Sequence, residues 1–381
     1  MHSHENLVFL PDSPYSEWII KRCEELFPHL NQYVLLVDEL GQPTRLRYPD
    51  LLILKNNQLE SLEKLHLQKP FKRIIVNYHT PFIGHFLECN KDKFGQTKVI
   101  WIIWSGDLYK HGKFLKRAYT PLTLTILPPK GRFKNIRQGI HHRMLQILGK
   151  PNQYTFEKSF SRFDMVGSFF EKDTIEAKEV LGVNAKWIRF AFLSLEELFA
   201  EKDLLRNPIL GNKIMVGHSG SPENNHLDVF ERLRELIPQN DRVVLSPLSY
   251  GNPKYLDFVK AKGKEWFGKN FESLEKFIPR ETYYNKLSEV SVAIFNHKIQ
   301  QAFGNILGLI FMGTKVFLNP ENPVYIELVQ AGIQVFDYSQ MTKEDLDSPL
   351  SKETISRNRE LMQQIFNEEK IRSFYKDIFL S

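Results

Sequence analysis

The chain has 381 residues, more than one compact core of roughly 100 to 200 residues accommodates, so two domains are expected. Hydrophobic residues make up 42% and charged residues 25% of the chain, which argues against a disordered or fibrous protein. The two cysteines, Cys23 and Cys89, are too few for a disulfide framework or a four-cysteine zinc site.

The apolar segments predict a protein of the cytoplasm. The N-terminal segment has no basic stretch followed by an apolar one, so a secretory signal is not predicted. The longest apolar stretch, 306–313, is far shorter than the ~18 residues that a membrane-spanning helix needs.

The net charge of +6 is unevenly distributed along the chain. Basic residues gather between positions 110 and 150, where no acidic residue occurs. They are Lys110, Lys113, Lys116, Arg117, Lys130, Arg132, Lys134, Arg137, Arg143 and Lys150. Nucleic acid and an anionic membrane surface would both suit such a block. A solvated basic face without a partner is the plain alternative.

In the first half, short β-prone segments alternate with amphipathic ones. Strands are predicted at 6–10, 33–37, 73–78, 98–104, 163–167 and 185–190. Helices are predicted at 16–27 and 173–182, the second ending at Gly182. This alternation is typical of a parallel sheet with helices on both faces.

The alternation stops at 202–212 and resumes in the second half. One strand is predicted to begin at 213, and three more are predicted at 242–246, 290–296 and 315–320. Helices are predicted at 226–237, 253–267 and 304–313. We therefore predict an α/β protein whose two doubly wound, Rossmann-like domains, 1–205 and 213–345, face each other across a cleft, with a hinge near 203–212. Residues 352–381 are predicted to form a terminal helix that packs back across the hinge.

Ligands of such sheets bind beyond the carboxyl ends of the strands, so the loops that follow strands are candidate sites. The second half has four such loops, which would converge on one crevice. They contain Ser219 and Gly220, then Tyr250, then Gly304 and Asn305, and finally Glu321 and Asn322. Glycines allow close backbone approach, and a helix that begins near Gly304 would present free N–H groups to an anion. One loop of this kind is more often a plain turn, but four together favour a nucleoside diphosphate.

In the first half, Asp107 and His79 follow two predicted strands and are the candidates for a base that deprotonates an incoming hydroxyl. Asp107 would equally suit the N-cap of a helix at 108–119, and His79 a structural histidine. Trp104 and Tyr109, with Trp101, are either core residues or rings that hold a sugar beside the carboxylate.

Several other kinds of site are not predicted. No Gly-x-Gly-x-x-Gly follows the first strand of either half, and no Walker-type loop occurs. Asp345 and Asp347 lie in what resembles a helix start, and His111, His141 and His142 lack ligand partners at metal-like spacing, so no metal is assigned. The charge of a leaving diphosphate would then be met by helix N-termini and by Lys, Arg, Ser or Gln side chains.

Three segments together resemble glycosyltransferase family 56, the bacterial TDP-4-acetamido-4,6-dideoxygalactose (TDP-N-acetylfucosamine):lipid II transferases. They are WIIWSGDLY at 101–109, VGHSGSPENNH at 216–226, and QQAFGNILGLIFMGTKVFLNPENP at 300–323. The resemblance implies a GT-B fold and metal-independent transfer of a deoxyamino sugar from a nucleotide donor. The acceptor that it implies is an oligosaccharide on undecaprenyl diphosphate, in enterobacterial common antigen synthesis.

Carried over by motif, the resemblance assigns residues to two sides of the reaction. The acceptor side would contain Trp104, Gly106, Asp107 and Tyr109. The donor side would contain Ser219, Gly220, Gln300, Gln301, Gly304, Asn305, Glu321 and Asn322. His218 stands where the family tends to have Asn.

The sequence thus predicts a fucosyltransferase-like glycosyltransferase without a cofactor, whose donor is a TDP- or UDP-linked sugar. It would lie on the cytoplasmic face of the bacterial inner membrane, held through the 110–150 basic block. An epimerase or hydrolase of nucleotide sugars could use the same scaffold, and a basic nucleic-acid-binding module is the alternative outside enzymology. The sequence leaves open the sugar, the nucleotide, the acceptor, the stereochemistry and the oligomeric state.

Overall fold

The structure is a computed structural model of the chain. It describes residues 4–37, 46–55, 58, 61–64, 70–127, 141, 143–198, 211–237 and 242–381. The chain divides into two compact units, which are described one at a time. Unit 1 comprises Met1–His111, Lys130–Ser194 and Glu368–Ser381, and unit 2 comprises Gly112–Pro129 and Leu195–Asn367.

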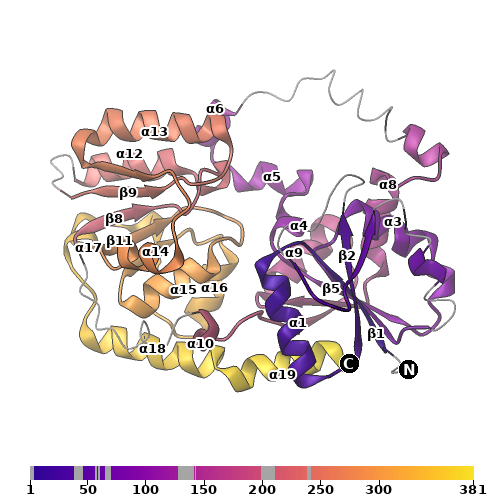
Figure 1. The fold of residues 1–381 in the computed structure, drawn as a ribbon. Helices are drawn as coiled ribbons and strands as arrows, with labels where there is room; N and C mark the ends of the chain where they lie inside the picture. The colour runs from indigo at the N-terminus through magenta and orange to yellow at the C-terminus, as the bar shows by residue number, and fades with distance from the viewer. Residues whose placement is uncertain are drawn as a thin grey trace. The chain divides into compact units, whose positions relative to one another are not determined.

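The core of unit 1 is a parallel sheet of seven strands in the order β3-β2-β1-β4-β5-β6-β7 (Figure 1). The strands are β1 Asn6–Leu10, β2 Asn31–Val37, β3 Leu52–Lys55, β4 Arg73–Asn77, β5 Lys98–Ile102, β6 Met165–Ser168 and β7 Lys186–Arg189. The strand order reverses between β1 and β4, which is where parallel sheets of this kind bind ligands. All six strands predicted for this half are confirmed. The edge strand β3 was missed because only Leu54 among its four residues is buried, so it has no apolar run.

Helices connect these strands, and several begin at the residue types that favour a helix start. The main ones are α1 Pro14–Leu26, α3 Pro81–Cys89, α4 Gly106–Tyr109, α8 Gln153–Ser159, α9 Glu171–Leu181 and α19 Glu368–Phe379. Ser13, Thr80 and Asn152 cap α1, α3 and α8 with their side-chain oxygens. As predicted, α9 ends at Gly182, whose φ of 73° suits glycine.

Unit 2 contains a second parallel sheet, with six strands in the order β10-β9-β8-β11-β12-β13. The strands are β8 Lys213–Val216, β9 Val244–Pro247, β10 Phe271–Leu274, β11 Val290–Phe295, β12 Lys315–Leu318 and β13 Phe336–Asp337. The four predicted strands are confirmed. The two edge strands were missed because β13 has two residues and the residues of β10 are only half-buried.

The helices of unit 2 cover this sheet on both faces (Figure 1). The longer ones are α12 His226–Leu236, α13 Pro253–Phe267, α14 Arg280–Leu287, α15 Phe303–Met312, α16 Pro323–Gln330 and α18 Lys352–Phe366. The short α17, Lys343–Asp347, begins with a capping box between Thr342 and Asp345, so Asp345 serves the helix start that the sequence indicated.

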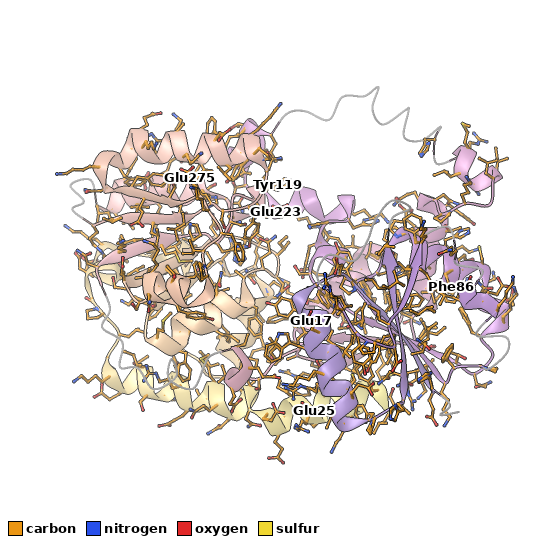
Figure 2. All side chains as sticks on the ribbon, viewed as in Figure 1. Glu17, Glu25, Phe86, Tyr119, Glu223 and Glu275 are labelled. Atoms are coloured by element: carbon orange, nitrogen blue, oxygen red, sulfur yellow. The ribbon has the colours of Figure 1, made fainter. Side chains whose placement is uncertain are left out.

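A segment from the first half of the sequence belongs to unit 2. It contains α5 Gly112–Ala118 and α6 Pro121–Ile126. The buried Asn225 holds it: its Nδ2 donates to the carbonyl of Ala118, and its Oδ1 accepts from the backbone N–H of Thr120. The hydroxyl of Tyr119 donates to Glu223 beside it, and Figure 2 labels both residues. The predicted hinge near 203–212 falls mostly outside the described residues and stays a prediction.

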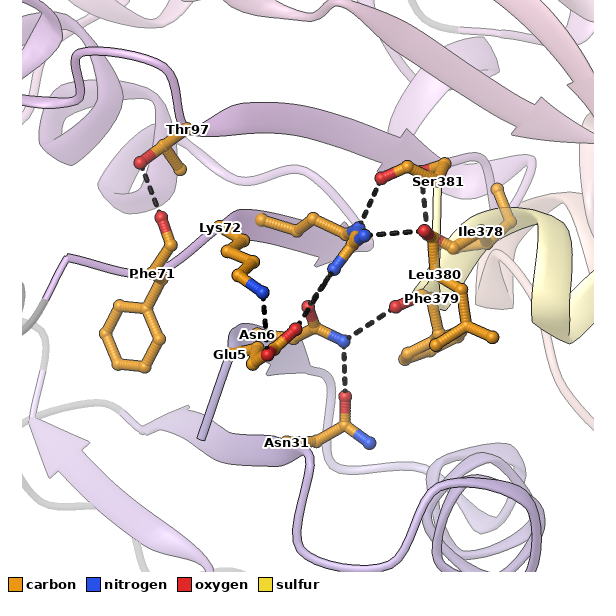
Figure 3. Close-up of polar contacts among 11 residues, drawn as sticks. Glu5, Asn6, Asn31, Phe71, Lys72, Thr97, Ile378, Phe379, Leu380 and Ser381 are labelled. Carbon is orange, nitrogen blue, oxygen red and sulfur yellow. Dashed lines mark hydrogen bonds and ion pairs between the residues drawn. The ribbon is translucent and has the colours of Figure 1, made fainter. Parts of the chain in front are cut away.

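The C-terminal segment is two helices, so the single helix predicted for 352–381 is wrong. The chain leaves α18 at Asn367, which has extended backbone angles (φ −71°, ψ 162°), and α19 then lies in unit 1. Asn6 in β1 donates to the carbonyl of Phe379, and Arg73 in β4 donates to the carbonyls of Leu380 and Ser381 (Figure 3). The end of the chain therefore packs against the amino ends of the central strands of unit 1.

Candidate functional site

In unit 1, the predicted Asp107 ties together the segments that follow β4 and β5. Its Oδ2 accepts hydrogen bonds from the backbone N–H of His79 at 2.9 Å and from the indole Nε1–H of Trp101 at 2.6 Å. Its Oδ1 accepts from the backbone N–H of Trp104 at 2.9 Å. The carboxylate thus links the carboxyl ends of β4 and β5, and β4 is one of the two strands between which the strand order reverses.

Burial governs the ionisation of this carboxyl group. Asp107 is 6% exposed, and burial raises its pKa to about 6, against the opposing effect of the Trp101 indole and of the backbone N–H groups of His79, Trp104 and Asp107 itself. A carboxyl group with such a pKa exchanges its proton near neutral pH, which suits a base. The two oxygens of a carboxylate can together accept about four hydrogen bonds, so the group has the capacity to hold these donors and still meet a proton.

The helical segment around Asp107 differs from the prediction. Instead of one helix at 108–119, α4 ends at Tyr109 and α5 begins at Gly112. Asp107 lies inside the first turn of α4 rather than at its N-cap, which is Ser105 with a φ of 65°. Gly106 approaches the ring of Tyr78 so closely that a Cβ would lie 3.2 Å from Cε2. This position therefore suits glycine for packing within unit 1.

His79, which follows β4, lies in a cluster of aromatic side chains. Its Nε2 is 2.9 Å from the hydroxyl oxygen of Ser159, and its ring is packed against those of Trp101, Phe156 and Phe160. Burial lowers the pKa of the imidazole to about 3, so it is neutral at physiological pH. These contacts fit the structural histidine that the sequence left open, and a role as base stays a prediction.

The two aromatic residues predicted on this side have different surroundings. Trp104 is half-buried, and its ring contacts those of Tyr15 and Phe192 at centroid distances of 5.9 and 4.9 Å. Tyr109 is 1% exposed, and its hydroxyl donates to the buried carboxyl of Asp173 at 2.6 Å. Tyr109 therefore has the contacts of a core residue, whereas Trp104 is only half-buried.

In unit 2, the loops after β8 and β9 are tied to each other. The N–H of Gly220 donates to the carbonyl of Tyr250 at 2.7 Å, and the N–H of Asn252 donates back to the carbonyl of Gly220 at 3.0 Å. Gly251 has a φ of 134°, and a Cβ there would lie 2.2 Å from the carbonyl carbon of Gly220. The two loops therefore pack backbone against backbone, which only glycine permits.

The predicted residues of these loops are unequally accessible. Ser219 is buried, and its hydroxyl accepts from Nδ2 of Asn224 at 3.1 Å. Tyr250 is 53% exposed, with its ring edge-on to that of His218 at 6.5 Å. Ser219 thus shapes the loop, while Tyr250 presents an aromatic face that a base or sugar could stack on.

Three buried histidines that were not among the predicted site residues lie in or next to the loop after β8. His218 follows β8, His297 follows β11, and their ring centroids are 5.5 Å apart. His226 begins α12, with its Nε2 so near Gly217 that a Cβ there would lie 2.6 Å away. Nδ1 of His218 and Nε2 of the other two have no hydrogen-bond partner among the described residues. The signal in the sequence was the recurrence of His directly after strand ends.

The N-terminus of α15 follows the strand end of β11. Its N-cap, Ala302, has a φ of 56° and no side-chain cap, and no acidic residue lies in the first turn. Gln301 precedes it with a buried Oε1 that has no partner among the described residues, and Gln300 is also half-buried. A Cβ on Gly304 would have Leu198 Cδ2 as its nearest neighbour, at 3.8 Å. No side chain caps the N-terminus of this helix, which is the end of a helix that attracts anions.

The loop after β12 completes the set. Asn322 is fully buried: its Oδ1 caps α16 at Val324, and its Nδ2 donates to the carbonyls of His297 and Ile299. Its neighbour Glu321 has a side chain that is 62% exposed and that forms an ion pair with Lys298 at 2.8 Å. Asn322 therefore joins the loops after β11 and β12, and Glu321 is the member that can reach a ligand hydroxyl.

The structure thus brings the predicted donor residues to one edge of the sheet of unit 2. In the part of the chain that the structure describes, no group of three His, Cys, Asp or Glu residues is arranged to hold a metal ion. Within the same residues, no helix is long and apolar enough to cross a membrane.

A comparison with known families covers most of unit 2. Residues 197–378 match the sequence model of the family described as 4-alpha-L-fucosyltransferase, glycosyl transferase group 56. These residues, somewhat less than half of the chain, have the sequence of a group 56 glycosyltransferase. The resemblance inferred from the motifs at 216–226 and 300–323 is confirmed, and the protein is a fucosyltransferase-like transferase. The matched residues begin after the motif at 101–109, so the acceptor-side roles stay predictions.

Solved structures show that this glycosyltransferase has the GT-B fold. The chain is similar to sucrose-phosphate synthase from Thermosynechococcus elongatus, with a TM-score of 0.63 and 11% identity, over 99% of this chain and 100% of that one. It is also similar to a UDP-forming trehalose-phosphate synthase from Burkholderia xenovorans, with a TM-score of 0.62 and 10% identity, over 99% and 98% of the two chains. An α-glucosyltransferase in complex with UDP matches with a TM-score of 0.55 and 12% identity, over all of both chains.

We expect this glycosyltransferase to lose stability in mild acid because of its buried histidines. Burial lowers the pKa of His79 and His226 to about 3, and that of His297 to about 4. Between the ordinary histidine pKa and these values, the unfolded chain binds protons that the folded protein does not, so stability falls as the pH falls. Each histidine contributes up to about 1.4 kcal/mol per pH unit in that window.

Two buried carboxyl groups act in the opposite direction. Burial raises the pKa of Asp107 to about 6 and that of Asp173 to about 7, so both destabilise the fold as the pH rises above the ordinary aspartate range. The histidines, with His218 also shifted well down, outnumber them. The unfolding midpoint measured by calorimetry should therefore fall from neutral pH to about pH 5, and less steeply in His226→Gln. A midpoint that rises on acidification would contradict the expectation.

Proposed function

We propose that this glycosyltransferase moves a deoxyamino sugar of the N-acetylfucosamine type from a nucleotide diphosphate donor to a lipid-linked oligosaccharide. Unit 2 would bind the donor and unit 1 the acceptor. The observation that carries the proposal is the meeting, at one sheet edge, of an uncapped helix N-terminus, two loops packed through glycine, and an exposed tyrosine. The motif resemblance supports the sugar and the acceptor, and with them a place in a pathway like that of enterobacterial common antigen.

The donor diphosphate would bind at the N-terminus of α15. The N–H groups of its first turn, around Gly304 and Asn305, have no side-chain cap, and the helix dipole favours negative charge there. Lys298 and the Gln300–Gln301 pair precede the helix and can donate to phosphate oxygens. Such donors stabilise a leaving diphosphate without a metal ion or a cofactor, and we propose this mode of charge stabilisation for the reaction.

The nucleoside and the sugar would use the exposed side chains nearby. The exposed Tyr250 ring offers a face on which the base of the donor would stack. The donor would carry the nucleoside of a TDP-sugar or of a UDP-sugar, with deoxyribose or ribose. The Glu321 carboxylate can accept hydrogen bonds from sugar hydroxyls, with Lys298 holding it in place. Ser219, Gly220 and Asn322 would act by fixing the loops.

On the acceptor side, we propose that the carboxylate of Asp107 accepts the proton of the attacking hydroxyl. Trp104, with part of its ring exposed, would hold a sugar of the acceptor, and Gly106 would allow close approach. The lipid-linked acceptor places the enzyme at the cytoplasmic face of the bacterial inner membrane. The 110–150 basic block would attract the anionic surface, and Lys110, Lys113, Arg117, Arg143 and Lys150 are its exposed described members.

A panel of nucleotide sugars tests the proposal. A true donor present at 100 times its dissociation constant should stabilise the fold by about 2.7 kcal/mol, read as a rise in the unfolding midpoint. The same donors are then incubated with and without a lipid-linked oligosaccharide, and the sugar is followed by mass spectrometry. Consumption of donor without acceptor would instead support the epimerase or hydrolase. The absence of any shift with TDP- and UDP-sugars would overturn the donor site.

A further inference from the structure

A short helical turn in unit 1 exposes three large apolar side chains to solvent. Residues 143–147 are helical, and Met144, Ile147 and Leu148 are 57%, 80% and 61% exposed. The spacing of these residues, three and four positions apart, puts them on one face of a helix. Figure 1 shows this turn beside α8, at the outside of unit 1.

The backbone holds this apolar face in a defined shape. The N–H of Leu148 donates to the carbonyl of Met144, and the N–H of Lys150 donates to the carbonyl of Leu145 at 2.8 Å. The turn ends at Gly149, whose φ of 61° is the left-handed conformation that closes helices. Nδ2 of Asn152, the N-cap of α8, donates to the carbonyl of Lys150. The exposed side chains therefore project from a closed turn anchored to α8.

Basic side chains flank the apolar face. Arg143 and Lys150, at the two ends of the turn, are both exposed, and no acidic residue occurs anywhere from 110 to 150. Tyr154, in the first turn of α8, adds a ring that is 55% exposed. Apolar side chains between cations and a tyrosine are the combination that binds at the interface of an anionic bilayer.

We propose that residues 143–150 form a membrane-inserting element that places Met144, Ile147 and Leu148 among the acyl chains of an anionic bilayer. Arg143 and Lys150 then lie at the phosphate level. A second copy of the chain is a poorer occupant, because a stable protein interface buries about 800 Å² on each partner and three side chains provide much less. Uniform positive charge would also repel a second copy. The proposal rests on the lipid-linked acceptor proposed above and identifies how the enzyme reaches it.

The test compares vesicle binding of the full chain and its variants. Sedimentation with vesicles of phosphatidylcholine containing phosphatidylglycerol should bring down the wild-type protein, and pure phosphatidylcholine should bring down much less. Met144→Ser/Ile147→Ser/Leu148→Ser should lower the partition coefficient for the mixed vesicles at least about tenfold, because apolar burial contributes to binding along with charge. Arg143→Glu/Lys150→Glu should abolish the preference for the anionic vesicles.

Ile175→Ser is the matched control, because Ile175 in α9 is an apolar residue of unit 1 that is 48% exposed and lies outside the basic block. It should bind vesicles like the wild type. Equal binding by the triple serine variant and the wild type would overturn the proposal. So would a wild-type dimer in solution that the triple variant loses, since the apolar face would then be covered by a second copy.

Transfer assays separate this inference from the proposed function. With an acceptor on a short, water-soluble lipid, the triple variant should turn over like the wild type, and with the acceptor in vesicles it should be impaired. If vesicle binding behaves as expected while no lipid-linked acceptor is glycosylated, the proposed function fails and the membrane element stands. If transfer to the vesicle acceptor is unaffected in the triple variant, the membrane element fails and the function stands.

Discussion

Replacing Asp107 with Asn is expected to lower turnover by a factor on the order of 100 or more while leaving donor affinity unchanged. The carboxylate of Asp107 lies in unit 1, whereas the proposed donor residues all lie in unit 2. An amide cannot take up the proton of the acceptor hydroxyl. Steady-state turnover and isothermal titration with the nucleotide sugar give the two quantities separately.

The same substitution should also destabilise the fold, because the carboxylate accepts three N–H groups. One carboxylate oxygen becomes an NH₂ group, which leaves either the donors on Oδ2 or the donor on Oδ1 unpaired. A buried unpaired N–H costs about 1–3 kcal/mol of unfolding free energy, part of which is offset by removing a buried charge. A loss of turnover in Asp107→Asn therefore does not by itself separate a catalytic role from a structural one. A second measurement is needed, one that a purely structural role would not change.

The pH profile provides that reading. In the wild type, turnover should rise with pH through the range near 6 in which Asp107 loses its proton. Trp101→Phe removes the indole donor to Oδ2 but keeps the carboxylate, so it should raise the pKa of Asp107 and move this rise to higher pH. If Trp101→Phe leaves the profile in place, or if Asp107→Asn turns over like the wild type, Asp107 is a structural brace and has no part in proton transfer.

Much of the fold could be predicted because hydrophobic periodicity and helix ends are local. The helix at 253–267 has the predicted bounds, and Gly182 ends α9 where the sequence indicated. The edge strands β3, β10 and β13 were missed because they are short or half-buried and lack an apolar run. The break at Asn367 was missed because apolar residues continue with helical spacing on both sides of it, and only the contacts of α19 within unit 1 distinguish them.

The positions of the site residues could be predicted better than their accessibility. The rule that ligands bind at the carboxyl ends of strands led to Asp107, Gly220, Gly304 and Tyr250 from sequence alone. Whether a side chain faces a ligand or the core depends on tertiary contacts, as Tyr109 shows through its bond to Asp173. The residue type of Asn322 could not reveal that its amide Nδ2 donates to loop carbonyls. A side-chain amide can hydrogen-bond a helix N-terminus or a sugar hydroxyl equally well.

The sequence could also not predict that a segment following a strand of unit 1 belongs to unit 2. Residues 112–127 follow a strand of unit 1 and yet pack on unit 2, through the side chain of Asn225. Asn225 is more than 100 residues away along the chain from Thr120, so no local pattern connects them. The basic block therefore begins in unit 1, continues in unit 2 at 112–129 and returns to unit 1 from position 130, where its apolar turn at 143–147 lies.

Replacing Gly304 with Ala is expected to weaken donor binding at least tenfold, about 1.4 kcal/mol, without destabilising the protein. In the structure a Cβ on Gly304 would meet no atom nearer than 3.8 Å, so packing does not require glycine there. Alanine is also the better helix former, by up to ~1 kcal/mol in a helix interior. A methyl group would, however, stand beside the N–H groups that we assign to the diphosphate, where close approach is needed.

The comparison with two other glycines isolates the effect on binding. Gly112→Ala places a methyl group at the start of α5, where no atom lies within 4 Å, and it should change neither stability nor affinity. Gly251→Ala should unfold the loops after β8 and β9, because its Cβ would overlap the backbone of Gly220. Of the three variants, only Gly304→Ala should keep the wild-type unfolding midpoint and lose affinity for the nucleoside diphosphate. The folded chain does not fill the space beside Gly304, so a methyl group there would obstruct the ligand and leave the packing unchanged. Wild-type affinity in that variant would show that the diphosphate binds away from α15.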